Sequence, residues 1–183
     1  SWTLTALPLF VWMGEILFRT KLSENLFEGL SPWMQKLPGG LIHVNVVGCA
    51  LFAAISGSSA ATVATVGKMS IPELRKRNYP EKILLGSLAG SGTLGLLIPP
   101  SIILIIYGVT VQESIAKLFI AGIIPGIMIA IIFMFYVIIW SLINKKIMPK
   151  SFENFSFFEK IKRSKQLLPV ILLILAVIGS IYA

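Results

Sequence analysis

Long apolar blocks, separated by short polar segments, form the dominant pattern of the chain. Three of them approach or exceed the roughly 20 apolar residues that cross a bilayer as a helix, and a fourth begins at Leu167 and is still running at Ala183. No soluble core needs four such blocks, so the pattern predicts an all-α, polytopic membrane protein. The expected transmembrane segments are residues 1–18, 83–107, 118–143 and 167–183, the last being only the start of a span.

Residues 19–38 carry a narrower apolar stripe. Leucines recur there at helical spacing, and the opposite face holds Glu, Asn, Gln and Lys side chains. This pattern is typical of an amphipathic helix that lies in the membrane interface. Ser31 followed by Pro32 is a typical helix cap and first helical position, so we expect the segment to bend there.

Residues 39–69 are apolar except for a polar interruption near the middle, Ser56-Gly57-Ser58-Ser59. Two half-length helices that meet at this Ser/Gly tip would form a re-entrant hairpin. The alternative is one continuous span whose serines pack against a neighbouring helix.

The distribution of Lys and Arg favours the hairpin. Three lie in residues 19–38, five in 68–82, one in 108–117 and seven in 144–165. A hairpin puts fifteen of them on one side of the membrane and one on the other, whereas a crossing segment gives twelve and four. The positive-inside rule is obeyed better by the hairpin.

The apolar block at 83–107 has a defect in its middle. The run Gly90-Ser91-Gly92-Thr93-Leu94-Gly95 is followed by Pro99-Pro100-Ser101. Glycine lowers helix propensity, and two successive prolines remove two backbone donors within one turn. We therefore predict a discontinuous transmembrane helix, unwound at residues 90–95.

The remaining segments are read as loops and one regular span. Residues 70–82 are a cytoplasmic basic loop, in which Ser70 and Glu73 form a capping box that opens a short helix. Residues 108–117 are a periplasmic loop, and 118–143 is a regular helix whose Gly122 and Gly126 suit close packing. Residues 144–166 are a second basic cytoplasmic loop, where Ser156 and Glu159 could cap another short helix.

Composition supports a membrane protein: 56% of residues are apolar and only 13% are charged, against about 25% charged in soluble domains. The net charge of +8 would suggest nucleic acid in a soluble protein. Here the basic residues lie between apolar blocks, so we expect a lipid bilayer as partner and no nucleic acid. The chain starts inside an apolar run without a basic leader, which we interpret as an internal fragment of a longer protein.

Two helix breaks within about forty residues predict transport chemistry. Unwound backbone is costly in a membrane unless it lines a cavity or is buried in protein. Half-helix N-termini suit an anion, whereas carbonyl and hydroxyl oxygens suit a hard cation such as sodium. Tight packing alone, a channel and a non-catalytic scaffold are the rival interpretations. A membrane-embedded enzyme has little support, because His43 stands alone and the sequence has no Asp.

The two interrupted segments resemble a known family. Residues 48–67 read GCALFAAISGSSAATVATVG, and residues 86–101 read GSLAGSGTLGLLIPPS. In this order they resemble the large membrane subunit of tripartite ATP-independent periplasmic (TRAP) transporters, and the likeness extends over nearly the whole chain. The alternatives that remain are a sodium-coupled carboxylate transporter of another family, working without a binding protein, and a scaffold subunit.

The resemblance implies a fold and a mechanism. The family's large subunit consists of two inverted repeats, each with a hairpin and a broken helix, and moves as an elevator; this chain would supply most of the first repeat. The subunit works in the bacterial inner membrane with a periplasmic substrate-binding protein and a small membrane subunit, separate or fused. It takes up organic acids such as dicarboxylates or sialic acid, with Na⁺ as coupling ion and no other cofactor.

The resemblance also assigns roles to residues. The sodium site would be built from two groups, the tip and the break: Ser56, Gly57, Ser58, Ser59, Gly92, Thr93 and Gly95. Candidates for the substrate cleft are Asn45, Ser91 and Ser101. For Asn45 two other roles stay open, a hydrogen bond to a neighbouring helix and a place in the ion shell. Pro99 and Pro100 would shape the break rather than bind.

Overall fold

The structure, a computed structural model, describes residues 2–149 and 155–182, and this part of the chain is helical without strands. Nine α-helices and two short 3₁₀ helices follow one another there: α1 Trp2–Arg19, α2 Leu22–Met34, α3 Ile42–Ser56, α4 Ser59–Lys76, α5 Glu81–Gly92, η1 Thr93–Leu96, α6 Ile102–Val111, α7 Ile115–Ile143, α8 Phe157–Ser164, η2 Lys165–Leu167 and α9 Leu168–Tyr182. The all-α prediction is confirmed for the described residues.

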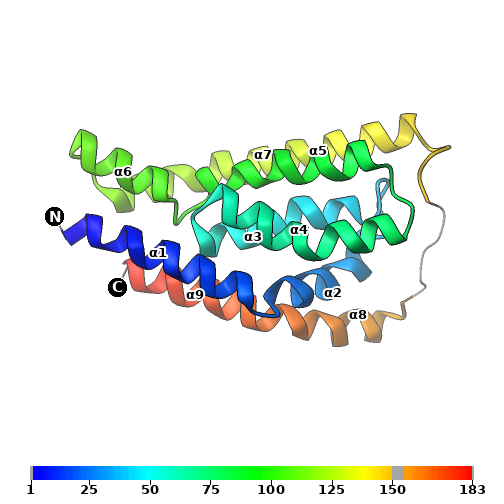
Figure 1. Ribbon diagram of the computed structural model, residues 1–183, viewed down its shortest axis with the longest axis horizontal. Coiled ribbons are helices and arrows are strands. Elements are labelled where there is room, and N and C mark those ends of the chain that lie inside the picture. The colour runs from blue at the N-terminus through cyan, green and yellow to red at the C-terminus, as the bar shows by residue number, and fades with distance from the viewer. Residues whose placement is uncertain (1, 150–154, 183) are drawn as a thin grey trace.

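The helices lie roughly along one common axis (Figure 1). The α2–α3 loop, the α4–α5 loop and the end of α7 lie together at one end of the molecule, which we call the basic end. The α6–α7 loop and both termini lie toward the other end (Figure 1). The loops at the basic end touch, since the N–H of Leu41 donates to the Tyr79 hydroxyl at 3.0 Å. Both flanks of the 39–69 segment thus face the same way, as the hairpin interpretation requires.

Helices α3 and α4 form the hairpin, with its turn at Gly57 and Ser58. Helix α3 is the centre of the fold and contacts α2, α4, α5, α7 and η1. Its side chains, together with those of neighbouring helices, fill the core; the fully buried ones on α3 include Ile42, Val44, Val46, Cys49, Phe52 and Ile55. The tip therefore projects from the most buried element of the chain.

Two local helix-start signals were wrong. Helix α4 runs unbroken through Ser70 and Pro72, so the predicted capping box does not open a new helix. Helix α2 likewise continues through Pro32, and the Ser31 hydroxyl donates back to the Phe27 carbonyl at 2.5 Å instead of capping. Both serines are buried, and the packing of their helices against neighbours overrides the local signal.

The apolar stripe of α2 packs within the chain. Leu26 is 2% exposed and Leu30 is 6% exposed, and α2 contacts α3, α4, α8 and η2. The stripe expected to lie in the membrane interface thus covers the bundle. At α8 the sequence signal was right, since the Glu159 carboxylate accepts from the Ser156 N–H at 2.9 Å and the capping box is formed.

The block at 83–107 is broken as predicted, but later in the chain than expected. Gly90, Ser91 and Gly92 remain in α5, η1 tightens the helix over Thr93–Leu96, and residues 97–101 are irregular before α6 begins. The prolines decide the position because Pro99 and Pro100 have no N–H to donate, whereas glycines merely weaken a helix. The break thus lies at residues 97–101.

Helix α7 has 29 residues and is about 43 Å long at 1.5 Å per residue. Among the described residues it is the one helix that is, by length and composition alone, suited to cross a membrane. The block at 83–107 divides into shorter helices.

Gly122 and Gly126 on α7 face the break. An added Cβ at Gly122 would lie 2.7 Å from the Leu97 carbonyl oxygen, and one at Gly126 would lie 2.7 Å from Ile98 Cγ1. The predicted close packing is confirmed, and its partner is the irregular segment.

This arrangement predicts the membrane topology. Cysteines introduced singly at Lys36 and Lys76 of a cysteine-free full-length protein should be labelled by a membrane-impermeant reagent from the same side, and a cysteine at Glu113 from the opposite side. The physical reason is that Lys36 and Lys76 flank a hairpin that turns back at its tip. Labelling of Lys36 and Lys76 positions from opposite sides would contradict the hairpin as a re-entrant element.

Candidate functional site

The hairpin turn is dictated by its Ser-Gly-Ser sequence. Gly57 adopts the left-handed conformation, with φ 61° and ψ 9°, which costs glycine little and other residues about 1 kcal/mol or more. Ser58 then takes an extended backbone, and its hydroxyl accepts from the Ala61 N–H at 3.4 Å as the N-cap of α4. One helix ends and the next begins within two residues.

A cluster of oxygen atoms lies inside the turn. The Ser56 hydroxyl lies 2.9 Å from the Thr62 hydroxyl, and the Thr62 hydroxyl donates to the Ser58 carbonyl at 2.7 Å. Ser56 and Thr62 are fully buried. Thr62 was not among the predicted site residues, although its position four residues after Ser58 on a helix could have indicated the contact.

The tip is joined to the broken helix by backbone atoms. The N–H of Ile102 donates to the Gly57 carbonyl at 3.1 Å, and an added Cβ at Gly57 would lie 2.7 Å from the Pro100 carbonyl oxygen. At Gly95 an added Cβ would lie 2.8 Å from the carbonyl group of Ser58 and from the N of Ser59. The backbone of the hairpin tip is therefore in contact with the backbone of the broken helix at Gly95.

Four helix ends meet at this junction. Helices α3 and η1 end there, and α4 and α6 begin there. Helix N-termini carry a partial positive charge and C-termini a partial negative charge, each about half an elementary charge. Ser101 closes the break by donating its hydroxyl to the Leu96 carbonyl at 2.6 Å and accepting from the Leu104 N–H at 3.5 Å. The junction offers carbonyl oxygens, hydroxyl oxygens and helix N-termini without a charged side chain in the turn.

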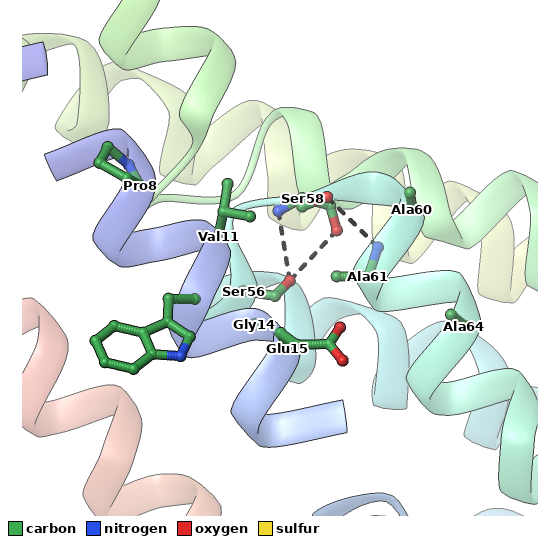
Figure 2. A pocket seen from close by; sticks show the side chains of 10 residues that line it. Pro8, Val11, Gly14, Glu15, Ser56, Ser58, Ala60, Ala61 and Ala64 are labelled. Carbon is green, nitrogen blue, oxygen red and sulfur yellow. Dashed lines mark hydrogen bonds between the residues drawn. The ribbon is translucent and has the colours of Figure 1, made fainter. Parts of the chain in front are cut away.

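A cavity of about 730 Å³ opens between α1 and the hairpin tip. Figure 2 shows Pro8 and Val11 of α1 on one side, and Ser58 with the small α4 residues Ala60, Ala61 and Ala64 on the other. Gly14 brings α1 close to the tip, since an added Cβ would lie 3.9 Å from the Ser56 carbonyl oxygen. The walls are mainly apolar, and the tip serines together with Glu15 form their polar part.

Glu15 is the charged residue of this cavity's lining. Its carboxylate extends from α1 toward the α4 side (Figure 2), and it accepts from Arg19 at 2.9 Å. The side chain is 54% exposed, so the ion pair adds little stability. The structure places this carboxylate beside the tip rather than within it.

Three predicted site residues lie away from the junction. The Thr93 hydroxyl faces the surface and donates to the Gly90 carbonyl at 2.6 Å. Asn45 lies eleven residues before the tip on α3, about 16 Å along the helix, and its amide donates to the Leu84 carbonyl and the Ser87 hydroxyl. Ser91 is buried and donates to the carbonyls of Ser87 and Asn45.

Asn45, Ser87 and Ser91 thus form a polar link between α3 and α5, and a role for Asn45 and Ser91 in a substrate cleft stays a prediction. Ser101 is at the junction but is fully buried, and its hydroxyl is hydrogen-bonded to the Leu96 carbonyl and the Leu104 N–H. Among the described residues no group of three or more His, Cys, Asp or Glu side chains is placed to hold a metal ion.

A helical chain with a long apolar helix, a Ser/Gly-tipped hairpin and a broken helix has the architecture of a membrane transport protein. Comparison with known proteins is more specific. The family model "Tripartite ATP-independent periplasmic transporter, DctM component" matches residues 1–183. The chain belongs to this family.

The relatives transport different solutes according to their names. The C4-dicarboxylate TRAP transporter large permease protein DctM of Pseudomonas aeruginosa is 35% identical over 182 residues, which are 100% of this chain and 42% of the relative. The ectoine TRAP transporter large permease protein TeaC of Halomonas elongata is 37% identical over 142 residues, 78% of this chain and 33% of the relative. The sialic acid TRAP transporter permease protein SiaT of Haemophilus influenzae is 39% identical over 134 residues, 73% of this chain and 22% of the relative.

The chain thus spans about two fifths or less of the length of these relatives. Membership in the DctM family replaces the alternative of a carboxylate transporter from another family.

The backbone contact at Gly95 predicts a mutational effect. Gly95→Ala in the full-length permease should lower the melting temperature, because a methyl group 2.8 Å from three backbone atoms of Ser58 and Ser59 forces the break away from the tip. Overpacking of this kind costs about 1–3 kcal/mol. Gly86→Ala is the matched control: it lies in the same broken helix, its added Cβ meets nothing within 4 Å, and it should leave stability equal or higher. Equal melting temperatures for both variants would contradict the close contact.

Proposed function

We propose that this chain forms the sodium-binding part of a TRAP transporter large permease and drives uptake of a small organic acid across the bacterial inner membrane. The observation that carries the proposal is the joining of two helix discontinuities at one place, through the Ile102–Gly57 hydrogen bond and the Gly95 contact with Ser58 and Ser59. A packing role alone would need neither a turn nor a break at the same place.

The chemistry of the junction suits a hard monovalent cation. The candidate ligand atoms at the turn are the hydroxyl oxygens of Ser56, Ser58 and Thr62 and the Ser58 carbonyl oxygen. All of them are neutral oxygen atoms. Hydroxyl and carbonyl oxygens at unwound helix ends are the ligands expected for Na⁺ in transporters. We place the ion against Ser56, Ser58 and Thr62, with Gly92 and Gly95 letting the break approach.

We expect the solute to bind in the cavity between α1 and the hairpin tip. Lys and Arg are missing from its described lining, so attraction for an anion comes from the N-termini of α4 and α6 and from parts of the permease outside this chain. The names of the relatives include C4-dicarboxylate, ectoine and sialic acid. A small carboxylate-bearing solute is common to them.

The transport cycle that we propose moves the hairpin and the broken helix together. The junction binds them to each other, and α4 touches α1 through small residues, Gly14 facing Ala61, a contact that can slide. The hairpin enters the membrane from the basic end without crossing it. A periplasmic binding protein would deliver the solute, and a small membrane subunit, separate or fused, would brace the permease.

The test is sodium-dependent uptake in proteoliposomes that contain the complete transporter with its binding protein. Ser56→Ala and Thr62→Val each remove one hydroxyl oxygen from the turn, so the sodium concentration for half-maximal uptake should rise about tenfold or more. Thr110→Val removes an exposed hydroxyl that bonds only to the Ile106 carbonyl and should leave that concentration unchanged.

Thr93→Val tests a residue that the sequence predicts in the sodium site and whose side chain the structure places on the surface. An effect on the sodium requirement as large as that of Ser56→Ala would indicate that Thr93 is a sodium ligand. An unchanged sodium requirement in both Ser56→Ala and Thr62→Val would refute the proposed ion position. Uptake by the unmodified transporter without a sodium gradient would refute sodium coupling itself.

A further inference from the structure

A second cavity, of about 430 Å³, lies at the basic end, remote from the hairpin tip. We call it the basic-end pocket. It is formed by the α2–α3 loop, the α4–α5 loop and the end of α7. Its polar lining consists of the side chains of Lys36, Tyr79, Ser141 and Lys145, and its described lining contains no carboxylate. The proposed transport function uses none of these residues.

The pocket has a buried hydrogen-bonding wall. Within the described residues the Ser141 hydroxyl is buried and has no hydrogen-bond partner. The Tyr79 hydroxyl accepts from the Leu41 N–H at 3.0 Å, which leaves its own proton to be donated. Burial raises the pKa of Tyr79 more than the Leu41 N–H and the Arg77 charge lower it, so the hydroxyl stays protonated at neutral pH. Unpaired buried polar groups are costly and call for a partner.

Two glycines keep the space open. Gly39 and Gly40 have φ values of 100° and 53°, in the left-handed region that glycine favours. An added Cβ at Gly39 would lie 3.0 Å from the Ser141 hydroxyl oxygen, and one at Gly40 would overlap the Tyr79 hydroxyl. A side chain at either position would crowd the two hydroxyls.

The charge of the pocket selects an anion. Lys36 and Lys145 are exposed, and neither has a carboxylate partner in the described part of the chain. The remaining lining is apolar, contributed by Leu37, Pro38, Leu142, Met148 and Pro149. Leu142 of α7 lines the pocket and is 45% exposed, and the nearby Ile139 and Ile143 of the same helix are 56% and 77% exposed. An apolar helix face of this kind suits contact with the acyl chains of a lipid.

We propose that the basic-end pocket binds the phosphate of an anionic phospholipid, with Lys36 and Lys145 as counter-charges, Tyr79 and Ser141 as hydrogen-bond donors, and the acyl chains along α7. The combination of ammonium groups, neutral donors and an adjoining apolar face matches a phosphate linked to hydrocarbon, whereas a free solute would need no such face. Basic pockets between membrane helices bind lipid headgroups in this way. The lipid would tie the α2–α3 loop to the end of α7.

Lipid binding to the full-length permease, purified in neutral detergent, tests the proposal. Native mass spectrometry would measure the affinity for phosphatidylglycerol and, separately, phosphatidylcholine. Each lysine near an anionic lipid contributes a factor of about five in binding, so Lys36→Gln/Lys145→Gln should weaken the phosphatidylglycerol site about thirtyfold. Lys36→Arg/Lys145→Arg keeps the charges, should keep the site, and shows that the region folds when altered.

Lys82→Gln/Lys146→Gln is the matched control, because it removes two exposed lysines that do not line the pocket. It changes the net charge by the same amount and should alter the affinity less than threefold. Equal losses in the two glutamine variants, or equal binding of both lipids by the unmodified permease, would overturn the proposal. Displacement of the lipid by an excess of inorganic phosphate would also overturn it and identify a free-anion site.

Discussion

A polar backbone group inside a membrane must find its hydrogen-bond partner within the protein, since lipid offers none. Within the two apolar segments 39–69 and 83–107, regular helix is interrupted at the turn at Gly57 and at the irregular segment 97–101. Each supplies what the other lacks, because the carbonyl of Gly57 accepts from the N–H of Ile102. Helix α7 covers the same segment with Gly122 and Gly126. The cavity between α1 and the hairpin lies beside this joined pair of interruptions.

The existence of both interruptions could be read from the sequence with simple rules. Ser-Gly-Ser after an apolar run is a helix stop followed by a helix start, and Pro99-Pro100 cannot continue a helix. The rules could not give the position of the break along the chain, which lies at 97–101 and not at 90–95. Gly90 and Gly92 have low helix propensity, yet both remain in α5. At Gly92 the packing requires glycine, because an added Cβ would lie 2.0 Å from Val63 Cγ2. Packing gains offset the low helix propensity.

The sequence did not give the orientation of the hydroxyl side chains near the two interruptions. Hydroxyl residues were assigned by proximity to the breaks, but orientation decides their use: Thr93 points outward, and Asn45 and Ser91 turn toward each other between α3 and α5. Thr62 was overlooked because it lies in the second half of the hairpin, although the turn brings it back to Ser56. Side-chain direction on a helix depends on its rotation about its axis, which neighbouring helices fix and a local motif does not.

The contacts of the junction are made by backbone atoms and small residues. This agrees with a family whose relatives are named for solutes as different as C4-dicarboxylate, ectoine and sialic acid while all match this chain. Selection among solutes must then come from side chains that face the cavity, or from the parts of the relatives beyond the matched residues.

The hydrogen bond between Gly57 and Ile102 also has a consequence for biogenesis. Chains are synthesised from the N-terminus, and the acceptor at position 57 emerges 45 residues before the donor at position 102 (102 minus 57). The hairpin can be in place when the first turn of α6 is made, whereas the reverse order would leave the Ile102 N–H without its acceptor. The hairpin, which is made first, presents the Gly57 carbonyl to the later half-helix α6. The order of synthesis therefore lets the Ile102 N–H find its acceptor as soon as it is made.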